Sequence, residues 1–136
     1  DKKFFQQLRE ICDQKNSLLI FDEVQSGVGR TGKLWGYENL DIEPDGFTLA
    51  KGLGGGHAIG ALLVGKKANL FIPGDHASTF GGNPFACRAA LTVLEEISRR
   101  KILNNVFSRG NQLKKGFVEL SDKFPNIINW NFINFF

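Results

Sequence analysis

The chain has 136 residues with a formal net charge of +3, and 42% of its residues are hydrophobic. These values are typical of globular domains and exclude wholesale disorder. No apolar run approaches the ~20 residues that a membrane-spanning helix needs, and no basic-then-apolar leader opens the sequence, so we expect a cytoplasmic location and no membrane partner. Methionine is absent, even at position 1. We therefore expect an internal segment of a longer protein.

The surplus of positive charge lies in one stretch. Glu95–Lys123 holds seven basic and four acidic residues, and its apolar spacing predicts helix, so the charges fit a solvated helix face. Nucleic-acid binding would require clustered charge with stacking aromatic side chains or a known module, and the sequence contains neither. We expect no nucleic-acid partner.

Cysteine and histidine spacing predicts no metal site. Cys12 and Cys87 are far apart and lack CxxC or Cys/His spacing, so both are interpreted as buried small hydrophobic residues. His57 and His76 are isolated in the sequence, and we expect both to be structural or exposed.

The first half of the chain predicts one helix and three short strands. Apolar residues recur at helical spacing over Lys2–Lys15, and Asn16 is a plausible stop because Asn tolerates a left-handed backbone. The run Leu18–Phe21 is continuously apolar, which is typical of a strand buried on both faces of a parallel sheet. Phe47–Ala50 and Ala58–Val64 are the second and third candidate strands.

The second half predicts two helices. Asn83 and Pro84 form a strong helix start, as N-cap and first helical residue of a helix that continues over Phe85–Arg99. Its apolar residues at intervals of four are Phe85, Ala89, Val93 and Ile97. A further helix is expected over Ile102–Leu120, with one face formed by Val106, Leu113, Phe117 and Leu120. Helices that alternate with short buried strands indicate an α/β fold.

Two candidate strands end in a charged residue with glycines close behind. Leu18–Phe21 runs into Asp22, and Phe47–Ala50 runs into Lys51. Ligands of open α/β sheets sit beyond the carboxyl ends of the strands, so the two charges would face one crevice. A structural ion pair is the alternative, and spacing alone leaves both open. The four glycines of Gly52–Gly56 favour the close approach of a ligand.

A nucleotide site is a competing interpretation. Gly27–Lys33 fits the first seven positions of the phosphate-binding P-loop. The eighth position is Leu34, which lacks the hydroxyl that binds the metal ion there. No strand and helix remain to frame the loop, so an ATPase is disfavoured.

Four motifs in order resemble one family. They are Asp22–Gly32, Pro44-Asp45, Leu49–Gly56 and Gly74–Pro84, and they resemble the class-III aminotransferases, which use pyridoxal 5′-phosphate (PLP). The resemblance covers about residues 3 to 124. It implies the large domain of the type I PLP-dependent transferases, a mostly parallel sheet with helices on both faces, over residues 1–110. Residues 111–136 would then be a connecting helix and the truncated start of the small C-terminal domain.

The resemblance also implies roles at the cofactor. Lys51 matches the catalytic lysine that bonds covalently to the PLP aldehyde. Asp22 matches the acid that pairs with the pyridinium nitrogen, which keeps the ring able to accept electrons. Gln25 matches the amide that bonds the phenolic oxygen of the ring, and Val24 would pack against the ring face.

Further implied roles involve a homodimer and the substrates. Thr79 matches a threonine that binds the PLP phosphate of the neighbouring subunit, and Ser78 borders the acylated substrate across the same interface. The sequences of the four motifs are most similar to those of family members that take the amino group of N-acetylornithine and pass it to 2-oxoglutarate. Members that use ornithine or 4-aminobutyrate are the alternatives for the small-molecule amino donor.

The segment is short for this family. Relatives are about three times as long and carry an upstream half with the main phosphate loop, so we expect the isolated chain to be inactive and prone to association. A non-catalytic fragment that acts only through association is the remaining alternative. From Asn126 to Phe136 the sequence no longer resembles that of the family, which would fit a truncated or shifted reading frame.

Overall fold

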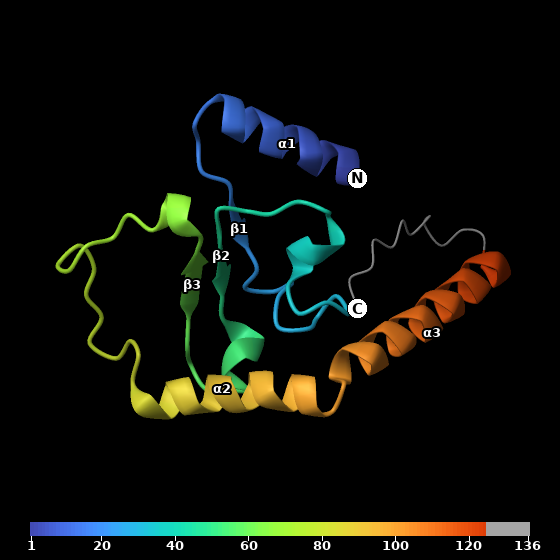
Figure 1. Cartoon of the computed structure of the whole chain (residues 1–136). Helices are drawn as coiled ribbons and strands as arrows, with labels where there is room; N and C mark the ends of the chain where they lie inside the picture. The colour runs from blue at the N-terminus through green and yellow to red at the C-terminus, as the bar shows by residue number, and fades with distance from the viewer. Residues whose placement is uncertain (125–136) are drawn as a thin grey trace.

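A computed structural model describes residues 1–124 (Figure 1). The expectation for Asn126–Phe136 lies outside these residues. None of the helices in the described part is long and apolar enough to cross a membrane. The elements in chain order are α1 (Lys2–Gln14), β1 (Ile20–Asp22), the 3-10 helix η1 (Gly36–Asn39), β2 (Gly46–Leu49), the 3-10 helix η2 (Lys51–Gly54), β3 (Ala61–Val64), the 3-10 helix η3 (Lys66–Ala68), α2 (Pro84–Arg99) and α3 (Ile102–Lys123).

The sheet of the described residues has three strands in the order β1-β2-β3. β1 and β2 are parallel, and Asp22 at the end of β1 pairs with Thr48 of β2. β2 and β3 are antiparallel. The sheet is therefore mixed, where a mostly parallel one was expected. The reason is that β3 follows β2 after the short segment of residues 50–60, whereas a parallel return needs a longer crossover.

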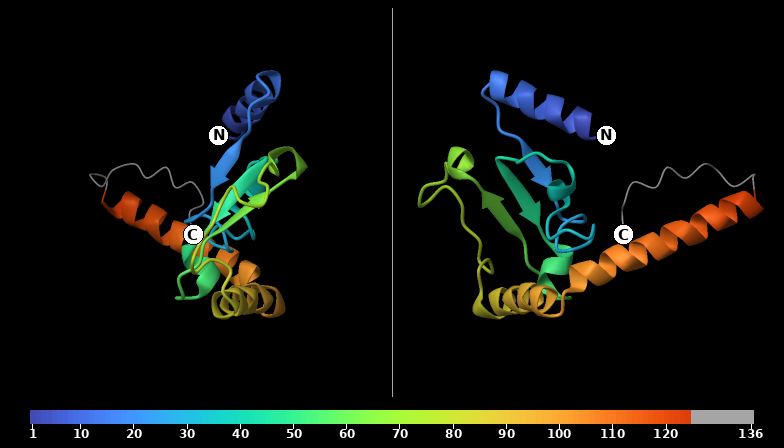
Figure 2. Two further views of the ribbon diagram at one scale, coloured as in Figure 1. Left: turned by 90° about the vertical axis from the view of Figure 1, so that its left-hand side faces the viewer. Right: turned by 45° about the vertical axis from the view of Figure 1, so that its right-hand side comes forward.

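The helices lie mainly at the two ends of the sheet. α1 lies near the amino ends of β1 and β2, α2 runs across their carboxyl ends, and α3 extends away from the sheet (Figure 2). Among the described residues, the expected cover of helices on both faces is missing, and Leu62 and Leu63 of β3 are exposed. Apolar strand residues of this kind require a cover.

The core surrounds β2, which is the central strand. Phe47 and Leu49 of β2 are buried, and they cluster with Leu53 of η2 and Ala90 of α2. β1 was expected to be buried on both faces, but its Ile20 is 44% exposed. That prediction is wrong for the described residues because β1 is an edge strand of this sheet, with no neighbour on its outer side.

α2 begins as the sequence predicts but buries a different face. Asn83 caps it, and the Asn83 side chain accepts a hydrogen bond of 2.9 Å from the Ala86 N–H. The buried residues are Ala86, Ala90 and Ile97, whereas Phe85 is 71% exposed. The buried face of α2 is therefore shifted by one residue from the predicted face at Ala86 and Ala90, and coincides with it at Ile97. Cys87 is consequently exposed, which corrects its expected burial.

The other two helices are less buried than expected. Asn16, just after α1, has φ of +50°, which confirms a left-handed stop, and Cys12 is half-buried. α3 continues three residues beyond the expected end and contains no buried residue. Its Leu113 and Leu120 are exposed.

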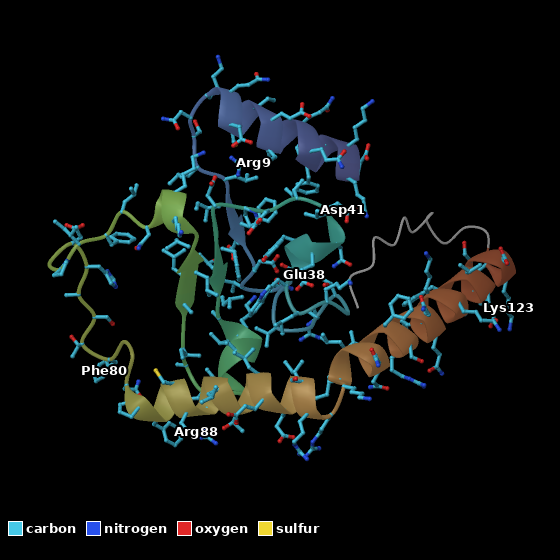
Figure 3. The ribbon with its side chains drawn as sticks, in the orientation of Figure 1. Arg9, Glu38, Asp41, Phe80, Arg88 and Lys123 are labelled. Atoms are coloured by element: carbon cyan, nitrogen blue, oxygen red, sulfur yellow. The ribbon has the colours of Figure 1, made fainter. Side chains whose placement is uncertain are left out.

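Arg9 joins α1 to the start of the sheet (Figure 3). Its Nη1 donates to Asp45 Oδ2 at 2.9 Å, and the Leu19 N–H donates to the same oxygen at 2.8 Å. The Leu19 N–H and, against the effect of partial burial, the Arg9 guanidinium hold the pKa of Asp45 below its usual value. Asp45 therefore fixes α1 and the approach to β1 relative to β2.

We expect Asp45→Asn to loosen this junction. Loss of the charge-assisted bonds should destabilise α1 locally by about 1–2 kcal/mol, measured as faster hydrogen–deuterium exchange of α1 amides. Because the folded pKa of Asp45 is lowered, its contribution is present above about pH 4, the unfolded value, and is lost as pH falls through the folded value. Asp41→Asn is the matched control, since Asp41 pairs with Lys2 in solvent. Equal effects of the two variants would contradict this role.

Candidate active site

Asp22 lies at the carboxyl end of β1 and is held by two hydrogen bonds. Its Oδ1 accepts from the Val24 N–H and from the Thr48 hydroxyl, each at 3.0 Å. The Val24 N–H, then the Thr48 hydroxyl and the nearby Lys51 ammonium, hold the pKa of Asp22 below its usual value. No described residue donates a hydrogen bond to Oδ2. Asp22 is exposed, so the carboxylate keeps one oxygen available at the strand end.

Lys51 begins η2 directly after β2. Its backbone has φ of +41°, in the left-handed region that residues with a side chain rarely adopt. Strained backbone of this kind is concentrated at functional sites. The exposed Lys51 Nζ lies 3.4 Å from Gln25 Oε1. The structure thus brings Asp22, Gln25 and Lys51 to one edge of the sheet, where the sequence places the crevice.

Lys51 lines two pockets. The first, of about 890 Å³, is lined by Val24, Gln25 and Lys51 together with the 27–30 loop and α3. The second, of about 720 Å³, lies between Lys51, the 56–60 segment and the loop before α2. A Cβ on Gly56 would meet nothing within 4 Å. The amine therefore has open space on both sides, which a ligand could occupy.

Ser78 and Thr79 lie elsewhere. Both are exposed on the loop between η3 and α2, and Ser78 Oγ accepts from the Gly81 N–H at 3.0 Å. Neither residue lines either of the two pockets beside Lys51. Within this one chain, the structure does not bring them to the Asp22–Gln25–Lys51 group.

The P-loop-like segment packs instead of forming a cradle. A Cβ on Gly29 would lie 3.0 Å from Leu103 of α3, and one on Gly32 would lie 3.6 Å from Phe107 of α3. The absence of a side chain lets Gly29 approach Leu103 closely, whereas at Gly32 the φ of +83° is the reason for glycine. The described residues also contain no group of acids, histidines or cysteines that could hold a metal ion.

The sequence matches a family model over nearly its whole length. The model of the class-III aminotransferases matches residues 1–129. The chain belongs to the class-III aminotransferases. This membership removes the nucleotide-binding alternative and confirms the resemblance on which the site residues were assigned. The family is PLP-dependent.

The individual relatives include acetylornithine and ornithine aminotransferases. The chain is 81% identical over 129 residues to acetylornithine aminotransferase of Prochlorococcus marinus subsp. pastoris, covering 95% of this chain and 31% of that protein. The structure of acetylornithine aminotransferase of Elizabethkingia anophelis aligns with a TM-score of 0.82 and 37% identity, over 90% of this chain and 33% of that one. Ornithine δ-aminotransferase of Plasmodium falciparum aligns with a TM-score of 0.79 and 32% identity, over 93% of this chain and 32% of that one. The chain thus spans about a third of the length of these aminotransferases.

Two residues beside the group of Asp22, Gln25 and Lys51 were not predicted from the sequence. Thr48 was not singled out because a threonine inside a strand has no distinctive pattern, yet the parallel register pairs it with Asp22. Glu23 directly follows Asp22, and its residue type alone does not distinguish it from an exposed acid. It is the one buried polar or charged residue among residues 1–124, at 3% exposure. The signals in the sequence are its position close behind an apolar run and the glycine at position 36.

Thr48→Val should raise the pKa of Asp22. The substitution keeps the side-chain shape but removes the hydroxyl that donates to Asp22 Oδ1. The pKa should move toward its usual value and stay below it, because the Val24 N–H remains. Carboxyl chemical shifts followed through an acid titration measure the change. Thr31→Val is the control, since Thr31 bonds Asn39 and lies outside this group. An unchanged Asp22 titration would rule out the role of Thr48.

Proposed function

We propose that this chain is the cofactor-binding middle of an aminotransferase that moves the amino group of N-acetylornithine to 2-oxoglutarate. The observation that carries the proposal is the convergence of Asp22, Gln25 and Lys51 at the carboxyl ends of β1 and β2. The substrate is supported by the 81% identity to the Prochlorococcus marinus acetylornithine aminotransferase. The Plasmodium falciparum relative acts as an ornithine δ-aminotransferase, so ornithine is the second candidate donor.

The residues present fit PLP. Asp22 Oδ1 is occupied by two donors of this chain, and Oδ2 receives none from the described residues. A protonated ring nitrogen is a suitable partner for that oxygen, and the lowered pKa of Asp22 keeps the carboxylate ionised at neutral pH. Gln25 would bond the phenolic oxygen of the ring, and Val24 would contact the ring face. PLP, when bound, supplies the electron sink that stabilises a carbanion next to the substrate nitrogen.

Lys51 has two tasks in this proposal. Its amine would hold PLP covalently while no donor is bound. As a free amine it would accept the proton of the reacting carbon of the donor as a general base and deliver it to C4′ of PLP as a general acid. Lys51 lines both pockets described above, and these offer its side chain space for both tasks.

A homodimer completes the site in the proposal. Ser78 and Thr79 would reach the active site of the neighbouring subunit, Thr79 at the PLP phosphate and Ser78 at the acyl group of the donor. Their loop is exposed, and the residues around it present apolar side chains to solvent, namely Leu70, Phe71, Ile72, Phe80 and Phe85. An exposed apolar surface of this kind is what a second copy would cover.

Residues 1–110 are proposed as part of the large domain and residues 111–136 as the start of the small one. The division falls inside α3, which is continuous from Ile102 to Lys123, so this helix would connect the two. The exposed apolar residues of α3 would be covered by the rest of the small domain. By itself the chain should not turn over substrate, because it spans 31% of the Prochlorococcus relative.

One experiment tests the cofactor role. A chimera is made in which residues 1–129 of this chain replace the matching segment of the full-length Prochlorococcus marinus relative. The chimera is loaded with PLP, reduced with borohydride and digested, and mass spectrometry maps the modified peptide. We expect the label on Lys51. A label elsewhere, or none, would overturn the proposal. Comparing kcat/KM for N-acetylornithine, ornithine and 4-aminobutyrate then decides the donor.

A further inference from the structure

Glu23 is buried but takes no part in the proposed chemistry. Its Oε2 accepts hydrogen bonds from the Ser26 hydroxyl and the Gly36 N–H, each at 2.8 Å. Its Oε1 accepts from the Tyr37 N–H at 2.6 Å. Both oxygens are therefore bonded to a segment more than ten residues further along the chain, at the first turn of η1. An acidic side chain at the start of a helical turn is electrostatically favourable.

The backbone of Glu23 is equally constrained. Its N–H donates to Thr48 O at 3.0 Å, which continues the pairing of β1 with β2 past the end of the strand. Its carbonyl oxygen accepts from the Gly27 N–H at 2.9 Å, which closes the turn. Gln25 lies in that turn. Glu23 thus fixes both ends of the short segment that carries Gln25 to within 3.4 Å of Lys51.

The surroundings are shaped to admit this carboxyl group. A Cβ on Gly36 would lie 2.7 Å from Glu23 Oε2, closer than real Cβ contacts, and a tight 3.0 Å from Oε1. Behind Tyr37 and Trp35, Phe47 of β2 packs against both rings at centroid distances of 5.2 Å. The donors that hold Glu23 are therefore themselves held against the core.

We propose that Glu23 is a positioning residue that sets the placement of Gln25 against Lys51. It does so by tying the 23–27 turn to the start of η1, and the hydrogen-bond partners of its side chain are Ser26, Gly36 and Tyr37 rather than Gln25 or Lys51. The inference rests on the proposed function, because Gln25 would act on the ring of PLP. Its effect on the cofactor should therefore pass through Gln25.

Glu23→Gln tests the proposal in the chimera. The amide nitrogen of Gln cannot accept a hydrogen bond, so at least one of the three donors loses its partner. Without PLP, the Gly27, Gly36 and Tyr37 amides should exchange with deuterium about tenfold faster. With PLP, the absorption maximum should shift, and kcat should fall about tenfold with KM changed less. Glu38→Gln is the control, since Glu38 is exposed and bonds the same loop through the Trp35 N–H; it should change none of these values.

A double-mutant cycle decides whether Glu23 acts through Gln25. We expect Glu23→Gln to shift the PLP spectrum in the Gln25 protein and to have no further effect in a Gln25→Ala background. Equal, additive shifts in the two backgrounds would overturn the proposal. Ser26→Ala, which removes one donor from Glu23, should give a smaller shift in the same direction and serves if Glu23→Gln does not fold. Failure of the proposed function is seen separately, as an absent label on Lys51 in the unsubstituted chimera.

Discussion

Replacing Lys51 with alanine in the chimera should lower kcat by about 10⁴-fold, the upper end of what a general acid–base group contributes. The variant should also lose covalent PLP, because Lys51 supplies the amine that lies 3.4 Å from Gln25 and close to Asp22. Steady-state rates with N-acetylornithine and 2-oxoglutarate measure the first effect. Borohydride reduction followed by mass spectrometry measures the second.

The control for this variant is Lys33→Ala. Lys33 is an exposed lysine of the P-loop-like segment, and its removal should leave kcat within about twofold, as is usual for surface substitutions. Adding a small primary amine such as methylamine should restore part of the lost activity of Lys51→Ala, because the amine can occupy the vacated space and transfer the proton. A Lys51→Ala enzyme that keeps more than a tenth of the original kcat would contradict the assigned role.

The positions of Asp22 and Lys51 could be predicted because they depend on topology alone. Each follows an apolar run, and the carboxyl ends of parallel strands meet at one edge of a sheet. The pairing of β1 with β2 confirms that step. The direction of the Lys51 side chain could not be predicted, since it depends on a left-handed backbone that no propensity of lysine favours.

Burial was harder to predict than secondary structure. The helical spacing of α2 indicated its length and its cap, but Phe85 is exposed and Ala86 is buried. Which face of a helix packs depends on the neighbour it meets, and α2 meets η2, where small residues allow close approach. Ile20 is exposed for the same kind of reason, because β1 is an edge strand of the described sheet and has no strand on its outer side.

Glu23 shows where sequence patterns stop being informative. Two of its three donors are backbone N–H groups of residues 36 and 37, more than ten positions away. Every residue except proline has a backbone N–H group, so the sequence does not indicate which of them will donate to a buried carboxyl group. These partners can be identified only in the folded structure. The glycine at position 36 is a partial exception, since close approach of another atom is one of the few reasons for a glycine without a left-handed φ.

Phe47→Ala should have the largest effect on stability. Phe47 lies in the central strand at 8% exposure and contacts the rings of Trp35 and Tyr37 at 5.2 Å. Truncating a buried phenylalanine to alanine costs about 3–5 kcal/mol through lost burial and the cavity that remains. Urea unfolding of the chimera measures the change in the free energy of unfolding. Hydrogen exchange of the β2 amides shows that the loss is centred on this strand.

The same variant should also weaken the site, because Trp35 and Tyr37 belong to the loop that holds Glu23. Phe47→Leu is the graded control: it keeps most of the apolar area and should cost about 1–1.5 kcal/mol. If the ring contacts seat the 35–37 loop, Phe47→Ala should speed exchange of the Gly36 and Tyr37 amides much more than Phe47→Leu does. Equal exchange rates in the two variants would show that Phe47 does not hold the 35–37 loop in place. Glu23 alone would then position the turn that carries Gln25.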